Sequence, residues 1–271
     1  MNPAVVSQNS EKKLSDKIII VTGGTQGLGK SIAQHLAQLG AAGLVICGRD
    51  RQNGQTVAGT LAEIGTPALY VQADLSNETD CRQVVHACVE KFKRVDGLVN
   101  AAGVTTRGTL DDTSAALWDY IFAVNTRAPF ILMQEAVRVM KREGRGGSIV
   151  NILSMSSYGG QPFITAYCAS KGALATLTKN AANALRFDRI RVNGINMGWT
   201  VTDAEHQVQL AMGKPENWLE QIEPEQPFGR LLRPLDIAKL AAYLISDDSE
   251  MMTGSIIDFD QNVMGGYDDS P

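Results

Sequence analysis

Residues 17–29 read KIIIVTGGTQGLG, and this stretch decides the fold of the chain. The apolar run at 18–21 is typical of a short buried strand, and the apolar residues between 32 and 39 recur at helical spacing. Between them, Gly23, Gly27 and Gly29 let the backbone approach a pyrophosphate at a helix N-terminus, where unpaired N–H groups favour an anion. The Gly-x3-Gly-x-Gly spacing differs from the usual Gly-x-Gly-x-x-Gly of dinucleotide-binding folds. A tight strand-to-helix connection without a ligand therefore remains the alternative.

The same alternation of strand and helix continues along the chain. Strands are expected near residues 17–22, 44–48, 68–72, 96–99, 147–153, 190–195 and 255–259, and helices near 27–39, 51–64, 77–92, 114–142, 165–186 and 234–246. Such alternation commits the strands to a parallel sheet with right-handed crossovers, so ligands gather at the carboxyl ends of the strands. We predict an α/β fold, a single-domain Rossmann-like doubly wound parallel sheet of about seven strands with helices on both faces. The domain is expected to span residues 15–271, after a frayed tail at 1–14.

A second stretch, residues 154–171, reads SMSSYGGQPFITAYCASK and places Tyr167 four residues before Lys171. Four residues of helix put both side chains on one face. A nearby ammonium favours the phenolate and lowers the pKa of the phenol below its usual ~10, which allows Tyr167 to exchange a proton near neutral pH. Taken alone, this spacing also fits a solvated helix face.

Further motifs appear in a fixed order along the chain. Residues 100–103 read NAAG and follow the expected strand at 97–99, Asn125 ends the sequence FAVN, and Ser154 stands thirteen residues before Tyr167. Together with the glycine-rich turn and the Tyr-x3-Lys pair, these motifs resemble the short-chain dehydrogenase/reductase family. The resemblance covers about residues 14–266. The second residue of the family's Asn-Asn-Ala-Gly motif is replaced by Ala101.

The resemblance implies a reversible hydride transfer between nicotinamide C4 and a secondary alcohol or ketone. Tyr167 would donate the proton to the carbonyl oxygen, and the Ser154 hydroxyl would hydrogen-bond that oxygen. Lys171 would lower the pKa of the phenol and bind the nicotinamide ribose. Asn125 would hold a water in a proton relay towards Lys171, with helix packing as its alternative role. Ser154 is chosen over Ser156 and Ser157 by spacing alone.

The resemblance also implies a nucleotide site made by residues from six segments. These are Gly23, Thr25, Gln26, Gly27, Leu28, Gly29, Arg49, Asp74, Leu75, Asn100, Ala101, Gly103, Tyr167, Lys171, Gly198, Thr200 and Thr202. Gly48 occupies the position of the acidic residue that binds the ribose 2′-hydroxyl of NAD, and Arg49 suits the 2′-phosphate of NADP. We expect NADP(H) to be favoured over NAD(H). Gln26 supplies no second cation, and Asp50 could partly neutralise Arg49, so NAD(H) remains the alternative.

Substrate recognition is expected in residues 199–232, which we interpret as a lid. The family's Pro-Gly after the sixth strand is replaced by Met197 and Gly198, which frees a backbone angle beside the nicotinamide. Aromatic and hydrogen-bonding groups in this region suit a sugar, a polyol or another hydroxylated compound, and also a keto ester or a cyclic ketone. The candidate substrate contacts are Met155, Gln161, Trp199 and His206. A third alternative is a nucleotide-binding sensor without turnover.

Composition narrows the possible partners. A net charge of −4 and a pI near 5.5 argue against binding to nucleic acid, and no apolar run approaches the ~20 residues of a membrane-spanning helix. Cys47, Cys81, Cys88 and Cys168 form no metal or redox pattern, which predicts free thiols, no metal site and a cytoplasmic location. The family resemblance implies a homotetramer. A small-molecule alcohol or ketone is the only other partner expected.

Overall fold

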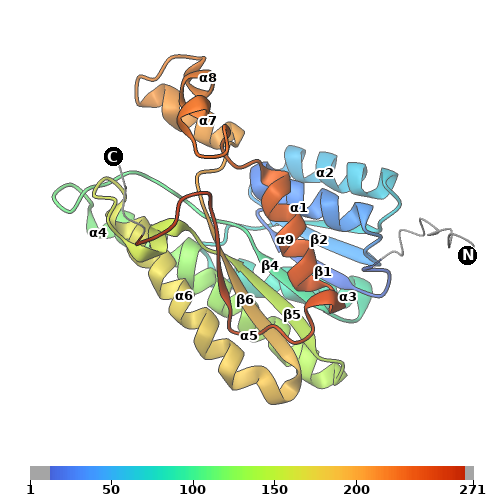
Figure 1. Cartoon of the computed structure of the whole chain (residues 1–271). Coiled ribbons are helices and arrows are strands. Elements are labelled where there is room, and N and C mark those ends of the chain that lie inside the picture. The colour runs from blue at the N-terminus through green and yellow to red at the C-terminus, as the bar shows by residue number, and fades with distance from the viewer. Residues whose placement is uncertain (1–12, 266–271) are drawn as a thin grey trace, which may run out of the picture.

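The computed structural model describes residues 13–265, and a seven-stranded parallel sheet forms its centre (Figure 1). The strand order is β3-β2-β1-β4-β5-β6-β7, so the direction of strand addition reverses beside β1. This confirms the predicted doubly wound α/β fold. The strands are β1 (Ile18–Thr22), β2 (Gly43–Gly48), β3 (Ala68–Gln72), β4 (Gly97–Asn100), β5 (Gly147–Ile152), β6 (Ile190–Met197) and β7 (Ile256–Phe259).

Helices cover both faces of this sheet and enclose two apolar cores. Ile18 and Ile20 belong to the core beneath α3, α5 and α6, whereas Ile19 and Val21 belong to the core beneath α1, α2 and α9. This division follows from the two-residue period of a strand, which needs apolar residues at every position when both faces are buried. The helices are α1 (Gly27–Gln38), α2 (Arg51–Glu63), α3 (Glu78–Phe92), α4 (Ala115–Phe122), α5 (Ala128–Glu143), α6 (Thr165–Leu185), α7 (Asp203–Ala211), α8 (Trp218–Ile222) and α9 (Pro234–Ile245).

Five short helical segments complete the connections between these elements. They are the π-helical η1 (Ala123–Arg127) and the 3₁₀ segments η2 (Met155–Tyr158), η3 (Arg186–Asp188), η4 (Glu223–Glu225) and η5 (Asp247–Ser249). The loops after β1, β4, β5 and β6 all leave the same edge of the sheet, because parallel strands end on one side. That edge carries most of the motifs named above.

Three features differ from the expectations. The helix expected at 114–142 is divided into α4 and α5 by η1, and the expected lid contains α7 and α8, which extend beyond the sheet in Figure 1. Leu14, assigned to the frayed tail, is fully buried against α1, and its N–H bonds Leu39 O. Local sequence does not reveal that contact, because residue 14 meets its partners only after folding. The rest of the expected tail, residues 1–12, lies outside the described part of the chain.

Candidate active site

Tyr167 and Lys171 lie on one buried face of α6, as their spacing predicts. Only 8% of Tyr167 and 4% of Lys171 are exposed, and the Lys171 Nζ lies 5.7 Å from the centroid of the Tyr167 ring. The ammonium also donates to Ile152 O, at the end of β5, over 2.7 Å. A cation and a phenol are thus held side by side away from water. The solvated-face alternative is wrong.

Ser154 joins this pair from the end of β5. The Ser154 side chain lowers the pKa of the Tyr167 phenol, and Ser154 Oγ lies 3.1 Å from Ser156 Oγ. Ser156 Oγ in turn donates to Gln161 Oε1 at 2.5 Å, whereas Ser157 donates to Asn196. Among these three serines, only Ser154 affects the pKa of the phenol. A chain of hydroxyls connects it with the predicted substrate residue Gln161.

Burial governs the protonation of this cluster in the absence of nucleotide. Desolvation raises the pKa of Tyr167 to about 12, against the smaller lowering effect of Ser154, and desolvation lowers the pKa of Lys171 to about 8. The expectation that Lys171 brings the phenol pKa below ~10 is therefore wrong for the protein alone. The physical reason is that a low-dielectric site penalises the phenolate and the ammonium together. Tyr167 is protonated at neutral pH, the form that a proton donor requires.

Asn125 lies at the centre of the π-helical segment η1, where the Ala128 N–H bonds Ala123 O. Its amide nitrogen donates to Val104 O at 2.9 Å and to Ser170 Oγ at 3.1 Å, and its oxygen accepts from Val104 N at 2.8 Å. Both amide N–H groups are therefore used within the protein. The side chain therefore joins the loop after β4 to α6, and only its amide oxygen keeps a free lone pair for a water.

The loop after β1 provides a cradle of backbone without side chains. Gly23 and Gly27 have positive φ angles of 64° and 50°, which L side chains rarely adopt. A Cβ on Gly29 would lie 2.3 Å from Gly23 O, and one on Gly23 would lie 3.0 Å from the Ala102 Cα. Gln26 is the N-cap residue of α1, and its side chain accepts no hydrogen bond from the helix. The first N–H groups of α1 are therefore not capped by Gln26. These features fit a nucleotide pyrophosphate.

The residues after β2 and β3 fit the adenosine end of a nucleotide. A Cβ on Gly48 would lie 2.6 Å from Thr25 Oγ1, so Thr25 fills the space beside the position where NAD enzymes carry an acid. The exposed Arg49 donates to Tyr120 OH over 3.2 Å, and Asp50 accepts from Asn53 N as the cap of α2. Arg49 and Asp50 form no ion pair within residues 13–265.

Asp74 and Leu75 follow β3 and lie close to this position. Hydrogen bonds from the Ser76 N–H and hydroxyl lower the pKa of Asp74, with a smaller contribution from the charge of Arg49. Leu75 is buried in the apolar core. Asp74 is therefore an ionised carboxylate that Ser76 holds in place and that interacts with the charge of Arg49. This position fits a residue beside an adenosine.

The motif at 100–103 is only partly directed towards this cradle. Asn100 is 2% exposed, and its side chain donates to Asn151 Oδ1 between β4 and β5 over 2.8 Å. The Asn100 amide nitrogen is thus used inside the sheet, whereas its amide oxygen is buried without a hydrogen-bond partner within residues 13–265. Ala101 and the following residue donate their N–H groups to Thr22 Oγ1. Gly103 lies beside both Asn125 and Lys171, with a hypothetical Cβ 3.5 Å from the amide oxygen and 3.6 Å from Nζ.

The segment after β6 brings the remaining predicted contacts to the same edge. A Cβ on Gly198 would lie 2.4 Å from the Asp260 carboxyl carbon, so no larger residue fits there. Thr200 Oγ1 donates to Gly198 O, and Thr202 Oγ1 accepts from Glu205 N as the cap of α7. The methyl group of Thr202 would lie 3.9 Å from a Cβ on Gly27. The glycine cradle and the start of the expected lid therefore approach each other.

The expected lid is held together by two stacked tryptophans. The rings of Trp199 and Trp218 lie 5.7 Å apart, and Trp218 Nε1 donates to His206 Nδ1 at 2.9 Å. Trp199 Nε1 donates to Glu205 Oε1 at 2.8 Å. His206 is thus used inside the expected lid by its bond with Trp218, whereas Trp199 remains 40% exposed. Met155 is half-buried at the start of η2, next to Ser154.

Two charged residues beside Tyr167 were not found by sequence reasoning. The charge of Arg107 lowers the pKa of the phenol and the charge of Glu205 raises it. The sequence does contain a signal for Glu205, because it is the last residue of a Thr-x-x-Glu capping pattern that begins at Thr202. Arg107 follows the motif at 100–103 by four residues, at the end of a strand where ligands gather.

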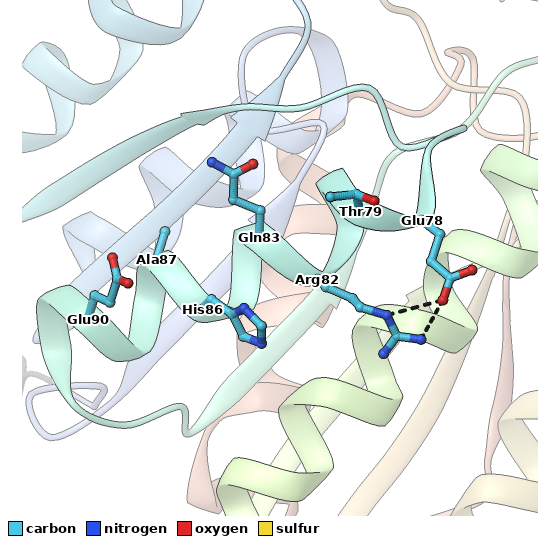
Figure 2. Close-up of a pocket in the computed structure, with 7 residues that line it drawn as sticks. All are labelled: Glu78, Thr79, Arg82, Gln83, His86, Ala87 and Glu90. Atoms are coloured by element: carbon cyan, nitrogen blue, oxygen red, sulfur yellow. Dashed lines mark hydrogen bonds and ion pairs between the residues drawn. The ribbon is translucent and has the colours of Figure 1, made fainter.

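A separate hollow of about 570 Å³ lies along the outer side of α3 (Figure 2). Its lining consists of Glu78, Thr79, Arg82, Gln83, His86, Ala87 and Glu90, all from that helix. Arg82 pairs there with Glu78 and with the buried Glu135 of α5. None of the predicted site residues lines this hollow, so we do not assign the reaction to it. Within residues 13–265, no group of three or more His, Cys, Asp or Glu side chains could hold a metal ion, and no helix could cross a membrane.

Comparison with known proteins identifies the family. Residues 23–265 match the family model described as enoyl-(acyl carrier protein) reductase. The solved structure of a short-chain type dehydrogenase/reductase from Mycobacterium marinum superposes with a TM-score of 0.85 at 29% identity, over 95% of this chain and 99% of that one. The chain belongs to the short-chain dehydrogenase/reductase family.

Two curated members of this family are similar over nearly their whole length. The NADP-dependent (R)-specific alcohol dehydrogenase of Lentilactobacillus kefiri is 34% identical over 94% of this chain and 98% of that protein. Galactitol 2-dehydrogenase of Agrobacterium fabrum is 32% identical over 92% of this chain and 96% of its own. As a short-chain dehydrogenase/reductase, the protein is a nicotinamide-dependent oxidoreductase that interconverts secondary alcohols and ketones.

Proposed function

We propose that this protein is an NADP(H)-preferring dehydrogenase/reductase of hydroxylated small molecules, with Tyr167 as its proton donor and acceptor. The observation that carries the proposal is the buried cluster in which Ser154 and Lys171 contact Tyr167 from two sides. Placing an ammonium and a phenol out of water lowers stability, and groups perturbed in this way are concentrated at functional sites. A nucleotide-binding sensor would have no use for that arrangement.

The nicotinamide cofactor, when bound, supplies or accepts the hydride. In the reducing direction Tyr167 gives its proton to the carbonyl oxygen, and the Ser154 hydroxyl donates to the same oxygen as negative charge develops there. In the oxidising direction the phenolate takes the proton from the alcohol. Lys171 stabilises that phenolate by its charge and hydrogen-bonds the ribose hydroxyls of the cofactor. The hydrogen bond from Lys171 Nζ to Ile152 O holds the ammonium in the position that both roles require.

The proposed nucleotide contacts come from the cradle and its surroundings. The backbone of residues 23–29 binds the pyrophosphate, and Asp74 lies at the adenine. Gly103, Thr200 and Thr202 bind the nicotinamide end. Asn100 serves this site indirectly, because its bond to Asn151 holds the ends of β4 and β5 together.

A preference for NADP(H) is supported by the surroundings of Gly48. This residue offers no carboxylate to a ribose 2′-hydroxyl, and the exposed Arg49 side chain hydrogen-bonds the neutral Tyr120 hydroxyl and forms no ion pair within residues 13–265. Asp50 is engaged as a helix cap and leaves the charge of Arg49 available. The relative from Lentilactobacillus kefiri is named as NADP-dependent. A guanidinium in this position binds a phosphate in preference to a hydroxyl.

A hydroxylated substrate is supported by the groups around the tyrosine. The Ser156 hydroxyl, the Gln161 amide and the Glu205 carboxylate offer several hydrogen bonds, while Trp199 supplies an aromatic face. A sugar, a polyol or a related compound uses both kinds of contact. The similarity to galactitol 2-dehydrogenase agrees with this class. Residues 199–232 are proposed to form the lid that excludes water from this site.

We further propose a cytoplasmic homotetramer. Phe130 of α5 is 46% exposed, and the outer face of α6 consists mainly of small residues, a combination that favours close packing against a second copy. Burial raises the pKa of Cys47 and Cys88 to about 12, so these thiols are inert and suited to a reducing compartment. Sedimentation that shows a monomer at micromolar concentration would remove the tetramer.

The purified protein tests the proposed function directly. NADPH or NADH is mixed with ketones and keto sugars, and NADP or NAD with secondary alcohols and polyols, while the absorbance of the reduced nicotinamide is followed. Turnover of hydroxylated compounds with NADP(H) is expected. Turnover confined to cyclic ketones or keto esters would show that the substrate belongs to that class instead. Nucleotide binding without any turnover would support the alternative of a nucleotide-binding sensor.

A further inference from the structure

The loop between β4 and α4 runs along the catalytic face of α6. Gly103 lies beside Lys171, and Val104 is bound on both sides by the amide of Asn125. Further along, the Gly108 N–H donates to Phe163 O at 2.9 Å, and the Thr165 N–H donates to Gly108 O at 3.0 Å. Since Thr165 begins the helix that carries Tyr167, residues 103–108 pass from the lysine to the entrance of α6. Arg107 lies at the far end of this path.

Arg107 is a half-buried cation that has no ion pair or hydrogen bond within residues 13–265. Its guanidinium carbon lies 5.2 Å from the centroid of the Phe163 ring, and its Nε is buried with no hydrogen bond. Within residues 13–265, no carboxylate forms an ion pair with Arg107 and no oxygen accepts from it. A buried donor left unpaired lowers the stability of the fold. Arg82 and Arg94 differ from Arg107 because each forms an ion pair, with Glu135 and Asp96 respectively.

The charge of Arg107 acts on the Tyr167 phenol. It lowers the pKa of the Tyr167 phenol, and Glu205 of α7 has the opposite effect. Glu205 is not paired with Arg107, because its Oε1 accepts from Trp199 Nε1 at 2.8 Å and from Gln209 Nε2 at 2.7 Å. The two charges therefore face the same tyrosine from different elements, and only the carboxylate has found its donors.

We propose that Arg107 binds a carboxylate of the substrate, and that the protein acts on hydroxy acids and keto acids such as sugar acids. The proposal rests on the function proposed above and specifies its substrate. A guanidinium presents parallel N–H groups that match the two oxygens of a carboxylate, and a neutral hydroxyl would satisfy only one of them. Stacking on Phe163 fixes the plane of the guanidinium before a ligand arrives. The nucleotide phosphates belong to the cradle at Gly23 and to Arg49.

Matched pairs of substrates test this assignment. The pairs are acetoacetate with methyl acetoacetate, levulinate with methyl levulinate, and gluconate with glucitol, so that each acid has a neutral counterpart. In wild type, kcat/KM should favour the acid by about tenfold to a hundredfold, the usual effect of one charge-assisted pair. Arg107→Met should abolish that preference, mainly through KM of the acid, and Arg107→Lys should retain part of it. Arg186→Met is the matched control, because Arg186 is also stacked on a phenylalanine, Phe187, in η3.

A binding measurement accompanies the kinetics. With Tyr167→Phe and NADPH present, each acid should shift the thermal unfolding midpoint more than its neutral counterpart, and the double variant Tyr167→Phe/Arg107→Met should lose that difference. Equal turnover and equal binding of acid and neutral compound in wild type would overturn the proposal while leaving the dehydrogenase function intact. Without turnover of any compound the proposed function fails, and the binding arm alone then decides the role of Arg107.

A second outcome would also overturn the assignment. If Arg107 served to hold Glu205 when the lid closes, Arg107→Met and Glu205→Gln would reduce kcat/KM for acids and neutral compounds alike. The double variant would then lose no more than either single variant. Selective loss for the acids, independent of Glu205→Gln, supports a substrate carboxylate.

Discussion

The Lys171 ammonium lies 5.7 Å from the centre of the Tyr167 ring, and both side chains are almost fully buried on α6. Burial acts on the two groups in opposite directions, raising the pKa of the phenol to about 12 and lowering that of the ammonium to about 8. At neutral pH the phenol is uncharged and the ammonium is charged. A phenolate that forms while Lys171 is still protonated has a cation beside it, and this relationship leads to the first three predictions.

Tyr167→Phe should reduce turnover by about a hundredfold or more, the usual contribution of a positioned acid or base. The substitution removes only the hydroxyl and keeps the ring that packs in α6. Nucleotide affinity and the thermal midpoint should therefore stay close to wild type, as measured by fluorescence titration and by thermal unfolding. Near-normal turnover on a substrate that wild type reduces well would show that the phenol is not the proton donor.

Lys171→Met should stabilise the nucleotide-free protein at pH 7 while it abolishes turnover. Because the folded pKa is about 8 and the ordinary value 10.5, the unfolded chain binds more protons between those two pH values. The free energy of unfolding of wild type therefore rises with pH between about 8 and 10.5. Below pH 8 the full cost of burying the ammonium is present. We expect a gain of about 1–3 kcal/mol at pH 7, reduced by the lost bond to Ile152 O, that shrinks towards pH 10.5. Denaturant unfolding at several pH values measures it.

The pH dependence of oxidation should shift in opposite directions in two variants. The phenolate is the required base, so kcat/KM for an alcohol should rise with pH, whereas reduction uses the protonated form present at neutral pH. Glu205→Gln removes a charge that raises the pKa of Tyr167, and should move the midpoint to lower pH. Arg107→Met removes a charge that lowers it, and should move the midpoint to higher pH. Identical profiles in both variants would show that neither charge reaches the phenol.

Arg49→Ala should weaken NADPH far more than NADH. Loss of a charge-assisted contact with the 2′-phosphate is worth roughly 1.5–3 kcal/mol, or about tenfold to a hundredfold in Kd. Arg51→Ala, at the exposed first residue of α2, is the neighbouring control. The two cofactors are titrated into each variant. Equal losses for both cofactors would show that Arg49 does not recognise the phosphate.

Gly29→Ala should destabilise the protein and prevent nucleotide binding. The added Cβ would lie 2.3 Å from Gly23 O, so the cradle has to move, and we expect a loss of about 2–4 kcal/mol. Gly59→Ala in α2 is the matched control, because a Cβ there meets nothing within 4 Å. That substitution should stabilise by about 0.5–1 kcal/mol through the lower entropy of the unfolded chain. Denaturant unfolding of both variants gives the comparison.

The sequence by itself determined the sheet, most of the helices and the grouping of Tyr167 with Lys171. The unbroken apolar run at 18–21 requires a strand buried on both faces, and helical spacing alone puts Tyr167 and Lys171 on one side of α6. Ser154 was chosen among three serines by its spacing of thirteen residues from Tyr167, which the end of β5 and the start of α6 determine. These features depend on residues close together in the chain, which is why their pattern can be read without a structure.

Only the tertiary structure decided how distant residues use their polar groups. Asn100 turns into the sheet because Asn151 lies beside it, Asn125 is engaged by Val104 and Ser170, and Leu14 is buried against α1. The unpaired Arg107 became visible in the same way, since a missing partner is a property of the whole surroundings. The pKa of Tyr167 was also decided there, because the energy of a charge depends on the water removed from it as well as on its nearest cation.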